Sequence, residues 1–121
     1  MLRRTLVAVS ATLLLSLTAG CSQEEVVDSA LRLEQKFAGL ERKSIKVGDH
    51  DIVYLEGGKG PTILMLHGIT ADSGNWTRFA GHYTGQYHVV IPDLPGFGDS
   101  SRIESASYSI PAQTERVHQL M

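Results

Sequence analysis

Short apolar runs separated by polar, glycine-containing segments dominate the pattern of this chain beyond its N-terminal third. The strongest runs are Thr62 to Leu66 and His88 to Ile91, and each is bounded by turn residues. Apolar runs of this length between turn signals are typical of buried β-strands. Two further β-prone runs, Lys43 to Val47 and Ile52 to Leu55, are separated by a glycine-containing tetrapeptide, and this spacing predicts a β-hairpin.

Three segments are predicted to be helical. From Ser22 to Leu40, apolar side chains recur every three or four residues and therefore share one helical face. The residues of this face are Val26, Ala30, Leu33, Phe37 and Leu40. The segment from Trp76 to Thr84 follows Asn75, a residue type that caps helix N-termini well. Ser109, followed by a proline in the first turn, predicts the start of a last helix that continues to the end of the chain.

The order of these elements predicts an α/β fold. A hairpin supplies antiparallel first strands, and the strand–helix alternation after it predicts parallel strands. With 121 residues, the chain has the length for at most one domain. The predicted organisation is a leader at residues 1–20, a tether or helix at residues 21–40, and an α/β domain at residues 41–121.

The first twenty residues have the layout of a secretory signal peptide. Arg3 and Arg4 precede an apolar stretch from Leu6 to Leu17, and small residues follow it. This order of charged, apolar and small residues is typical of a cleaved leader. The apolar stretch is shorter than the roughly 20 residues that a membrane-spanning helix needs. We therefore predict export of the protein rather than a membrane-spanning segment.

Cys21 is the single cysteine of the chain, so it has no disulfide partner within it. The segment from Leu17 to Cys21 resembles a bacterial lipobox, with Thr18 at the position where leucine is usual. The resemblance implies that Cys21 is lipidated and becomes the mature N-terminus. The protein would then be an exported, membrane-anchored lipoprotein of the bacterial cell envelope, with the outer membrane as one candidate location. The alternative is an ordinary signal peptide cleaved elsewhere, with Cys21 left as a thiol.

Composition and charge exclude several classes of function. The formal net charge is −2 and 20% of the residues are charged, so no basic excess indicates a nucleic-acid partner. The five histidines are scattered and none has a metal-ligand spacing to a second ligand residue. We therefore predict no metal and no other cofactor.

Two motifs carry a family resemblance. Leu64-Met65-Leu66-His67-Gly68 is followed shortly by Trp76, and Asp93-Leu94-Pro95-Gly96-Phe97-Gly98-Asp99-Ser100 comes later. In this order the motifs resemble those of the α/β-hydrolase superfamily, and the leader makes the bacterial lipase and esterase branch the most similar one. The resemblance covers residues 41–121 and implies the N-terminal portion of an α/β-hydrolase fold, with an incomplete sheet. It also implies a small-molecule or lipid ester as substrate.

The resemblance assigns roles to several residues. The backbone N–H of Ile69 would be an oxyanion-hole donor, because fixed N–H groups stabilise the negative charge of an acyl-transfer transition state. Gly68 would allow the sharp turn that points this donor inward, and His67 would shape the loop. Asp93 would hydrogen-bond nearby backbone. On residue type alone, His67 as a general base and Asp93 or Asp99 as a nucleophile or triad acid are the alternatives.

The nucleophile motif of the family is not found in this sequence. Family members carry a nucleophile in a G-x-S-x-G turn, with the acid and the histidine after it, and no such motif occurs among these residues. We therefore expect an N-terminal fragment of a lipid-anchored serine hydrolase, with no catalytic residue in this chain and no activity of its own. One alternative is an epoxide hydrolase or haloalkane dehalogenase with an aspartate nucleophile. Another is a short non-catalytic lipoprotein module.

Overall fold

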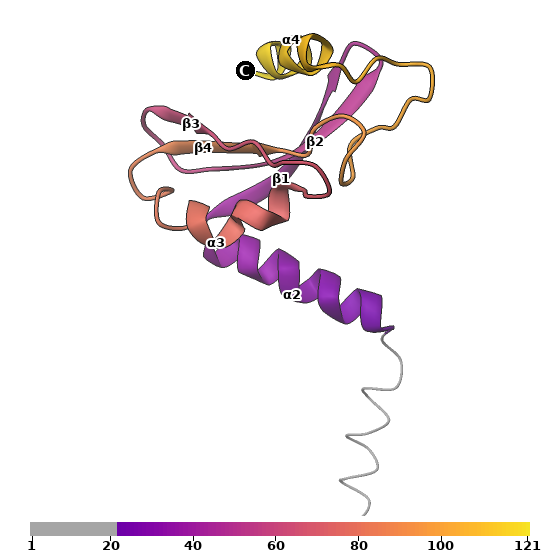
Figure 1. The fold of residues 1–121 in the computed structure, drawn as a ribbon. Helices are drawn as coiled ribbons and strands as arrows, with labels where there is room; N and C mark the ends of the chain where they lie inside the picture. Colours follow the sequence, from indigo (N-terminus) through magenta and orange to yellow (C-terminus); the bar gives the residue numbers. More distant parts are fainter. Residues whose placement is uncertain (1–21) are drawn as a thin grey trace, which may run out of the picture. The chain divides into compact units, whose positions relative to one another are not determined.

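The computed structural model describes residues 22–121 (Figure 1). The predicted leader and the lipidation candidate Cys21 lie outside the described residues. Contacts divide the chain into two units, Met1–Arg32 and Leu33–Met121. Among residues 22–121, no helix combines the length and apolar character needed to cross a membrane.

Within residues 22–121, the helices and strands follow the order that the sequence pattern predicts, with η1 and α3 adjoining as one helical segment. They are α2 (Gln23–Phe37), β1 (Leu40–Val47), β2 (His50–Gly57), β3 (Thr62–Leu64), η1 (Ser73–Trp76), α3 (Thr77–Ala80), β4 (His88–Pro92) and α4 (Ile110–Leu120).

Helix α2 has clear signals at both ends. Before its first residue, the Ser22 hydroxyl accepts from the Glu25 N–H and the Glu25 carboxylate accepts from the Ser22 N–H, which makes a capping box. After its last residue, Gly39 has a φ of 75° and reverses the chain. The prediction that the helix continues through Leu40 is wrong. Leu40 instead begins β1 and is buried in the core.

Strands β1 and β2 form the predicted hairpin, with both strands longer than expected. They pair antiparallel from Leu40 opposite Gly57 to Val47 opposite His50. Gly48, with a φ of 58°, is the first residue of the two-residue loop. A left-handed glycine at this position matches the twist of a tight hairpin.

The sheet has the order β1-β2-β4-β3. Strand β4 pairs antiparallel with β2 and parallel with β3. The predicted α/β arrangement is therefore confirmed: antiparallel first strands lead into a parallel strand–helix unit. Strand β3 lies at one edge, so within residues 22–121 its outer side pairs with no other strand.

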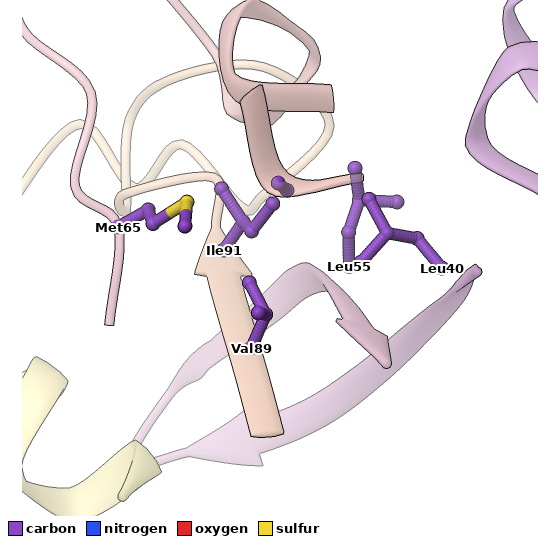
Figure 2. Close-up of a cluster of buried hydrophobic side chains, with 6 residues drawn as sticks. Leu40, Leu55, Met65, Val89 and Ile91 are labelled. Atoms are coloured by element: carbon purple, nitrogen blue, oxygen red, sulfur yellow. The ribbon is translucent and has the colours of Figure 1, made fainter. Parts of the chain in front are cut away.

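The hydrophobic core lies on one face of the sheet, where side chains from β1, β2 and β4 meet Met65, which follows β3 (Figure 2). Its buried members are Leu40, Leu55, Met65, Ala80, Val89 and Ile91. Apart from Ala80, each of these side chains contributes about 1.5–3 kcal/mol on burial. Trp76 is partly buried and packs against this cluster. Val90 is buried too, so both faces of β4, one of the two interior strands, are covered.

The segment after β3 differs from the prediction. Asp72, not Asn75, is the N-cap, since its carboxylate accepts from the Gly74 N–H at 2.8 Å. Asn75 is the third residue of η1, and its side-chain oxygen accepts from the Asp72 N–H at 3.5 Å. The regular helix ends at Ala80 rather than at Thr84, because the chain leaves it through a series of hydrogen-bonded turns.

Helix α4 begins as predicted. The Ser109 side chain accepts from the Ala112 N–H, and a proline occupies the first turn. The Gln113 amide donates to the Pro95 carbonyl at 2.8 Å, which ties the helix to the chain after β4. Figure 1 shows α4 and α3 on opposite sides of the sheet.

Candidate functional site

The candidate site lies where β3 and β4 end. These strands are parallel neighbours, so the residues that follow them meet at one edge of the sheet. His67 comes shortly after β3, and Asp93 comes directly after β4. In open α/β sheets, ligands bind outside the carboxyl ends of the strands. The His67-Gly68 motif and the motif that begins at Asp93 therefore lie at the same edge of the sheet.

His67 joins the two strand ends. Its side chain is buried, with 7% of its surface exposed. Its Nε2 accepts a hydrogen bond from the Leu94 N–H at 2.9 Å, so the ring proton is on Nδ1, which donates to the Gly68 carbonyl at 2.9 Å. The Phe97 ring packs edge-on, with 5.4 Å between ring centroids. Both nitrogens are bound to backbone groups, which leaves neither free to take a proton from a substrate.

A strained turn follows His67. The Ala71 N–H donates to the Gly68 carbonyl at 3.3 Å, which closes a four-residue turn. Thr70, the third residue of this turn, has a φ of 64°. A positive φ at the third position alone is the type II pattern, which favours glycine. A β-branched residue there is a genuine outlier, and such strain is concentrated at functional sites.

The role expected for Gly68 in this turn stays a prediction, because the conformation of Gly68 is one that other residues also adopt. Gly68 is not among the left-handed residues, and a Cβ built on it would meet nothing within 4 Å. The special conformation belongs to Thr70, two residues further on. Gly68 therefore borders open space, and the turn itself does not require glycine at this position.

Ile69 is the second residue of the turn and the most open one. Its exposed fraction is 85%. Its backbone N–H donates no hydrogen bond to any group of residues 22–121. Because Gly68 beside it has no side chain, the surrounding space is accessible to another molecule. Within residues 22–121, the Ile69 N–H therefore has no hydrogen-bond acceptor.

Asp93 binds backbone on both sides of the site. It is 2% exposed, and its Oδ1 accepts from the Ser73 N–H at 2.7 Å. Its Oδ2 accepts from the Asp99 N–H at 3.0 Å. A buried carboxylate needs such partners, because an unpaired charge is costly away from water. The expected structural role of Asp93 is confirmed, and its hydrogen bonds extend beyond the local turn to Ser73.

The turn after β4 is built around this carboxylate. Gly98 has a φ of 50°, and a Cβ on it would lie 2.4 Å from the Asp93 carboxyl group. Ser100 is buried: its hydroxyl donates to the Asp93 carbonyl at 2.6 Å and accepts from the Val53 N–H at 2.9 Å. Asp99 is exposed, and its carboxylate pairs with Arg42 of β1. Neither aspartate is placed as a nucleophile.

Sequence reasoning missed three parts of this arrangement. These are the Ser73 N–H as partner of Asp93, the Leu94 N–H as partner of His67, and the left-handed Thr70. The sequence Asp72-Ser73-Gly74-Asn75 is typical of turns and N-caps, so it could have indicated a backbone contact at Ser73. The other two are contacts or conformations of the backbone and leave no mark on residue type. Within residues 22–121, no group of three or more metal-ligating side chains comes together.

Comparison with known proteins identifies the class that this fold and site define. The family model described as alpha/beta hydrolase fold matches residues 61–121, which include β3, β4, α4 and both motifs. The chain belongs to this family.

Individual relatives extend the match toward the N-terminus. Lipase 1 of Psychrobacter immobilis is 40% identical over 94 residues, which are 75% of this chain and 29% of that protein. Fluoroacetate dehalogenase of a Burkholderia species is 38% identical over 89 residues, 70% of this chain and 29% of that protein. A crystal structure described as a membrane phospholipase A, a bacterial virulence factor, matches with a TM-score of 0.80 and 43% identity. That match covers 98% of this chain and 39% of the other. The chain thus spans about 30% of the length of these curated relatives.

Proposed function

We propose that these residues form the N-terminal part of a carboxylic ester hydrolase that uses a serine nucleophile. The observation that carries the proposal is the backbone N–H of Ile69, an exposed residue in the loop after β3, which donates to no group within residues 22–121. A donor held in this way suits the oxygen of a polarised carbonyl group.

The chemistry assigns one step to this chain. When a serine oxygen attacks the ester carbonyl, the new C–O bond forms and the π electrons of the carbonyl move onto its oxygen. The Ile69 N–H donates to that oxyanion, and one such donor contributes about 10²–10³ in rate. The His67 ring and Asp93 act on the loop rather than on the substrate. The nucleophile, the acid and the base histidine would come from residues other than these.

The class of substrate follows from the relatives. Lipase 1 and the membrane phospholipase A are named for cleavage of lipid esters, and both align with most of this chain. We propose a small-molecule or lipid ester as the substrate. Because ester hydrolysis by this route needs no metal, no cofactor is part of the proposal.

A second candidate keeps the fold and changes the nucleophile. The similarity to a fluoroacetate dehalogenase favours an aspartate in place of the serine, as in dehalogenases and epoxide hydrolases. The gene sequence that encodes the nucleophile turn separates the two. G-x-S-x-G supports the esterase, whereas an aspartate at the serine position supports the second candidate.

Activity measurements test the first proposal. The complete protein encoded by the gene is expected to hydrolyse a short-chain nitrophenyl ester and to be inactivated by an organophosphonate that modifies serine. A polypeptide of residues 22–121 alone is expected to be inactive, because a donor without a nucleophile cannot form the covalent intermediate. Enzyme-like hydrolysis by residues 22–121 would contradict this assignment. A complete protein without any hydrolytic activity would favour the non-catalytic module.

We also propose that Cys21 anchors the exported protein to a membrane of the bacterial cell envelope. The lipobox-like Leu17–Cys21 segment supports this, and more than one acyl chain would make the attachment stable. Expression in a bacterium with labelled palmitate tests it. The wild type is expected to carry the label and sediment with membranes, and Cys21→Ser is expected to lose both properties.

A further inference from the structure

We infer that Asp93 is a positioning residue for the Ile69 N–H, and that it acts through its hydrogen bond to Ser73. This inference rests on the proposed function, since it assigns Asp93 to the same oxyanion-binding loop. Asp93 does not touch the substrate in this arrangement. It determines where the donor lies.

The loop that carries Ile69 is fixed at its two ends by consecutive residues of the chain after β4. At its start, His67 Nε2 accepts from the Leu94 N–H at 2.9 Å. At its end, the Ser73 N–H donates to Asp93 Oδ1 at 2.7 Å. Only residues 68–72 lie between these two attachments. The conformation of this short segment is therefore determined by the chain after β4.

The carboxylate of Asp93 is suited to hold the loop because its orientation is fixed. Its second oxygen accepts from the Asp99 N–H at 3.0 Å, and the absence of a side chain at Gly98 leaves room for it. Hydrogen bonds to an ionised acceptor are about twice as strong as neutral ones. Because Asp93 is 2% exposed, water does not compete for the Ser73 N–H.

The strain at Thr70 explains why the loop needs two attachments. A non-glycine residue in the left-handed region is strained and persists only where the surroundings determine it. Thr70 is exposed, so its own side chain is not held by packing. If the Ser73 attachment is weakened, the turn can relax and the Ile69 N–H moves with it. A misplacement of about 1 Å at a reacting group can cost roughly 100-fold in rate.

Ser100 provides a matched control, because it is a buried polar residue of the same turn with different partners. Its hydroxyl joins the Asp93 carbonyl to the Val53 N–H, on the side of β2. Ser100→Ala therefore weakens the attachment of this turn to the sheet without removing either attachment of the Ile69 loop. A purely structural role of Asp93 predicts the same consequences for both substitutions.

The experiment compares Asp93→Asn and Ser100→Ala in the complete protein encoded by the gene, with a short-chain nitrophenyl ester as substrate. Asparagine leaves one acceptor oxygen for two N–H donors. We expect Asp93→Asn to lower kcat by about 10- to 100-fold with little change in KM, because the loss falls on the transition state. We expect Ser100→Ala to lower the melting temperature by about as much as Asp93→Asn does. Its kcat should stay within about 2-fold of the wild-type value.

Hydrogen exchange gives a readout that does not depend on activity. In Asp93→Asn, a peptide covering residues 67–76 is expected to exchange faster while a peptide covering β4 does not. If Asp93→Asn does not fold, Ser73→Pro breaks the same link from the loop side. Proline suits the first helical position after the extended Asp72. We expect the same loss of kcat from this variant.

The possible results distinguish a failure of the proposed function from a failure of the positioning role of Asp93. A wild-type protein without esterase activity contradicts the proposed function. An active wild type in which Asp93→Asn and Ser73→Pro keep their kcat contradicts the positioning role of Asp93. Equal losses of kcat in Asp93→Asn and Ser100→Ala also contradict it, since both would then report general destabilisation.

Discussion

The Leu94 N–H donates to Nε2 of His67 across 2.9 Å and so joins the ends of two parallel strands. The histidine has no remaining nitrogen for a substrate, because Nδ1 is bound to the Gly68 carbonyl. A residue that looks like a general base in the sequence is therefore a connector between backbone segments.

The first prediction concerns this connection. His67→Ala leaves the partly buried Leu94 N–H without an acceptor, so we expect it to lower the free energy of unfolding by about 1–3 kcal/mol. His67→Gln offers an amide oxygen and is expected to recover part of the loss. Urea unfolding of the complete protein measures both. His82→Ala, at an exposed position, is the control and should change stability by no more than about 0.5 kcal/mol. Equal stability of His67→Ala and His82→Ala would show that the connection contributes nothing.

The second prediction tests the strain at Thr70. At a φ of 64°, glycine is favoured over alanine because its backbone has no Cβ to clash. We expect Thr70→Gly to be more stable than Thr70→Ala by about 1 kcal/mol. Thr114, an exposed residue within α4, is the matched control. There the order should reverse, with glycine less stable by about 1 kcal/mol. The same order at both positions in thermal unfolding would argue against a left-handed Thr70.

The third prediction separates two glycines of the site. Gly98→Ala places a Cβ 2.4 Å from the Asp93 carboxyl group at a positive φ, so we expect a large loss of stability. Gly68→Ala meets nothing within 4 Å, so the fold should be preserved. Its methyl group nevertheless enters the open space beside the Ile69 N–H. We expect a normal melting temperature for Gly68→Ala with reduced ester hydrolysis by the complete protein. Full activity of this variant would show that the substrate does not use that space.

The fourth prediction concerns a polar row that crosses the sheet far from the site. Glu56 accepts from Lys43 and His88, each at 2.6 Å, and His88 contacts the Thr62 hydroxyl at 3.0 Å. The hydrogen bond from Lys43, and then that from His88, lowers the pKa of Glu56 below its ordinary value of 4.5. A carboxyl group with a lowered pKa stabilises the fold above pH 4.5, and the contribution is lost as the pH falls through the folded-state pKa.

Substitution of Glu56 tests this pH dependence. Glu56→Gln should be less stable than the wild type at pH 7, and the difference should narrow as the solution is acidified below pH 4.5. Glu104→Gln, at an exposed loop position, should show no such narrowing. Urea unfolding across this pH range provides the measurement. A difference that does not depend on pH would mean that the charge of Glu56 is not what stabilises the row.

Much of the fold could be predicted from the sequence. The hairpin, the two buried runs that became β3 and β4, and the capped start of α4 all depend on local signals, such as the left-handed Gly48 and the Ser109 hydroxyl. The errors lie at element ends. Leu40 continued the helical spacing but belongs to the core of the sheet, and Asn75 was preferred over Asp72 as a cap. Local propensity cannot decide between such neighbours, because tertiary packing selects the boundary.

The sequence by itself determined the family, the position of the candidate site and the absence of a G-x-S-x-G turn, because these depend on residue types in a fixed order. Only the tertiary structure decided how the site is held together. Asp93 meets Ser73 twenty residues earlier, and Thr70 adopts a conformation that its residue type disfavours. Both features involve backbone groups, which every residue carries alike. The folded chain alone selects which of these groups meet, and within residues 22–121 that selection leaves the N–H of Ile69 without an acceptor.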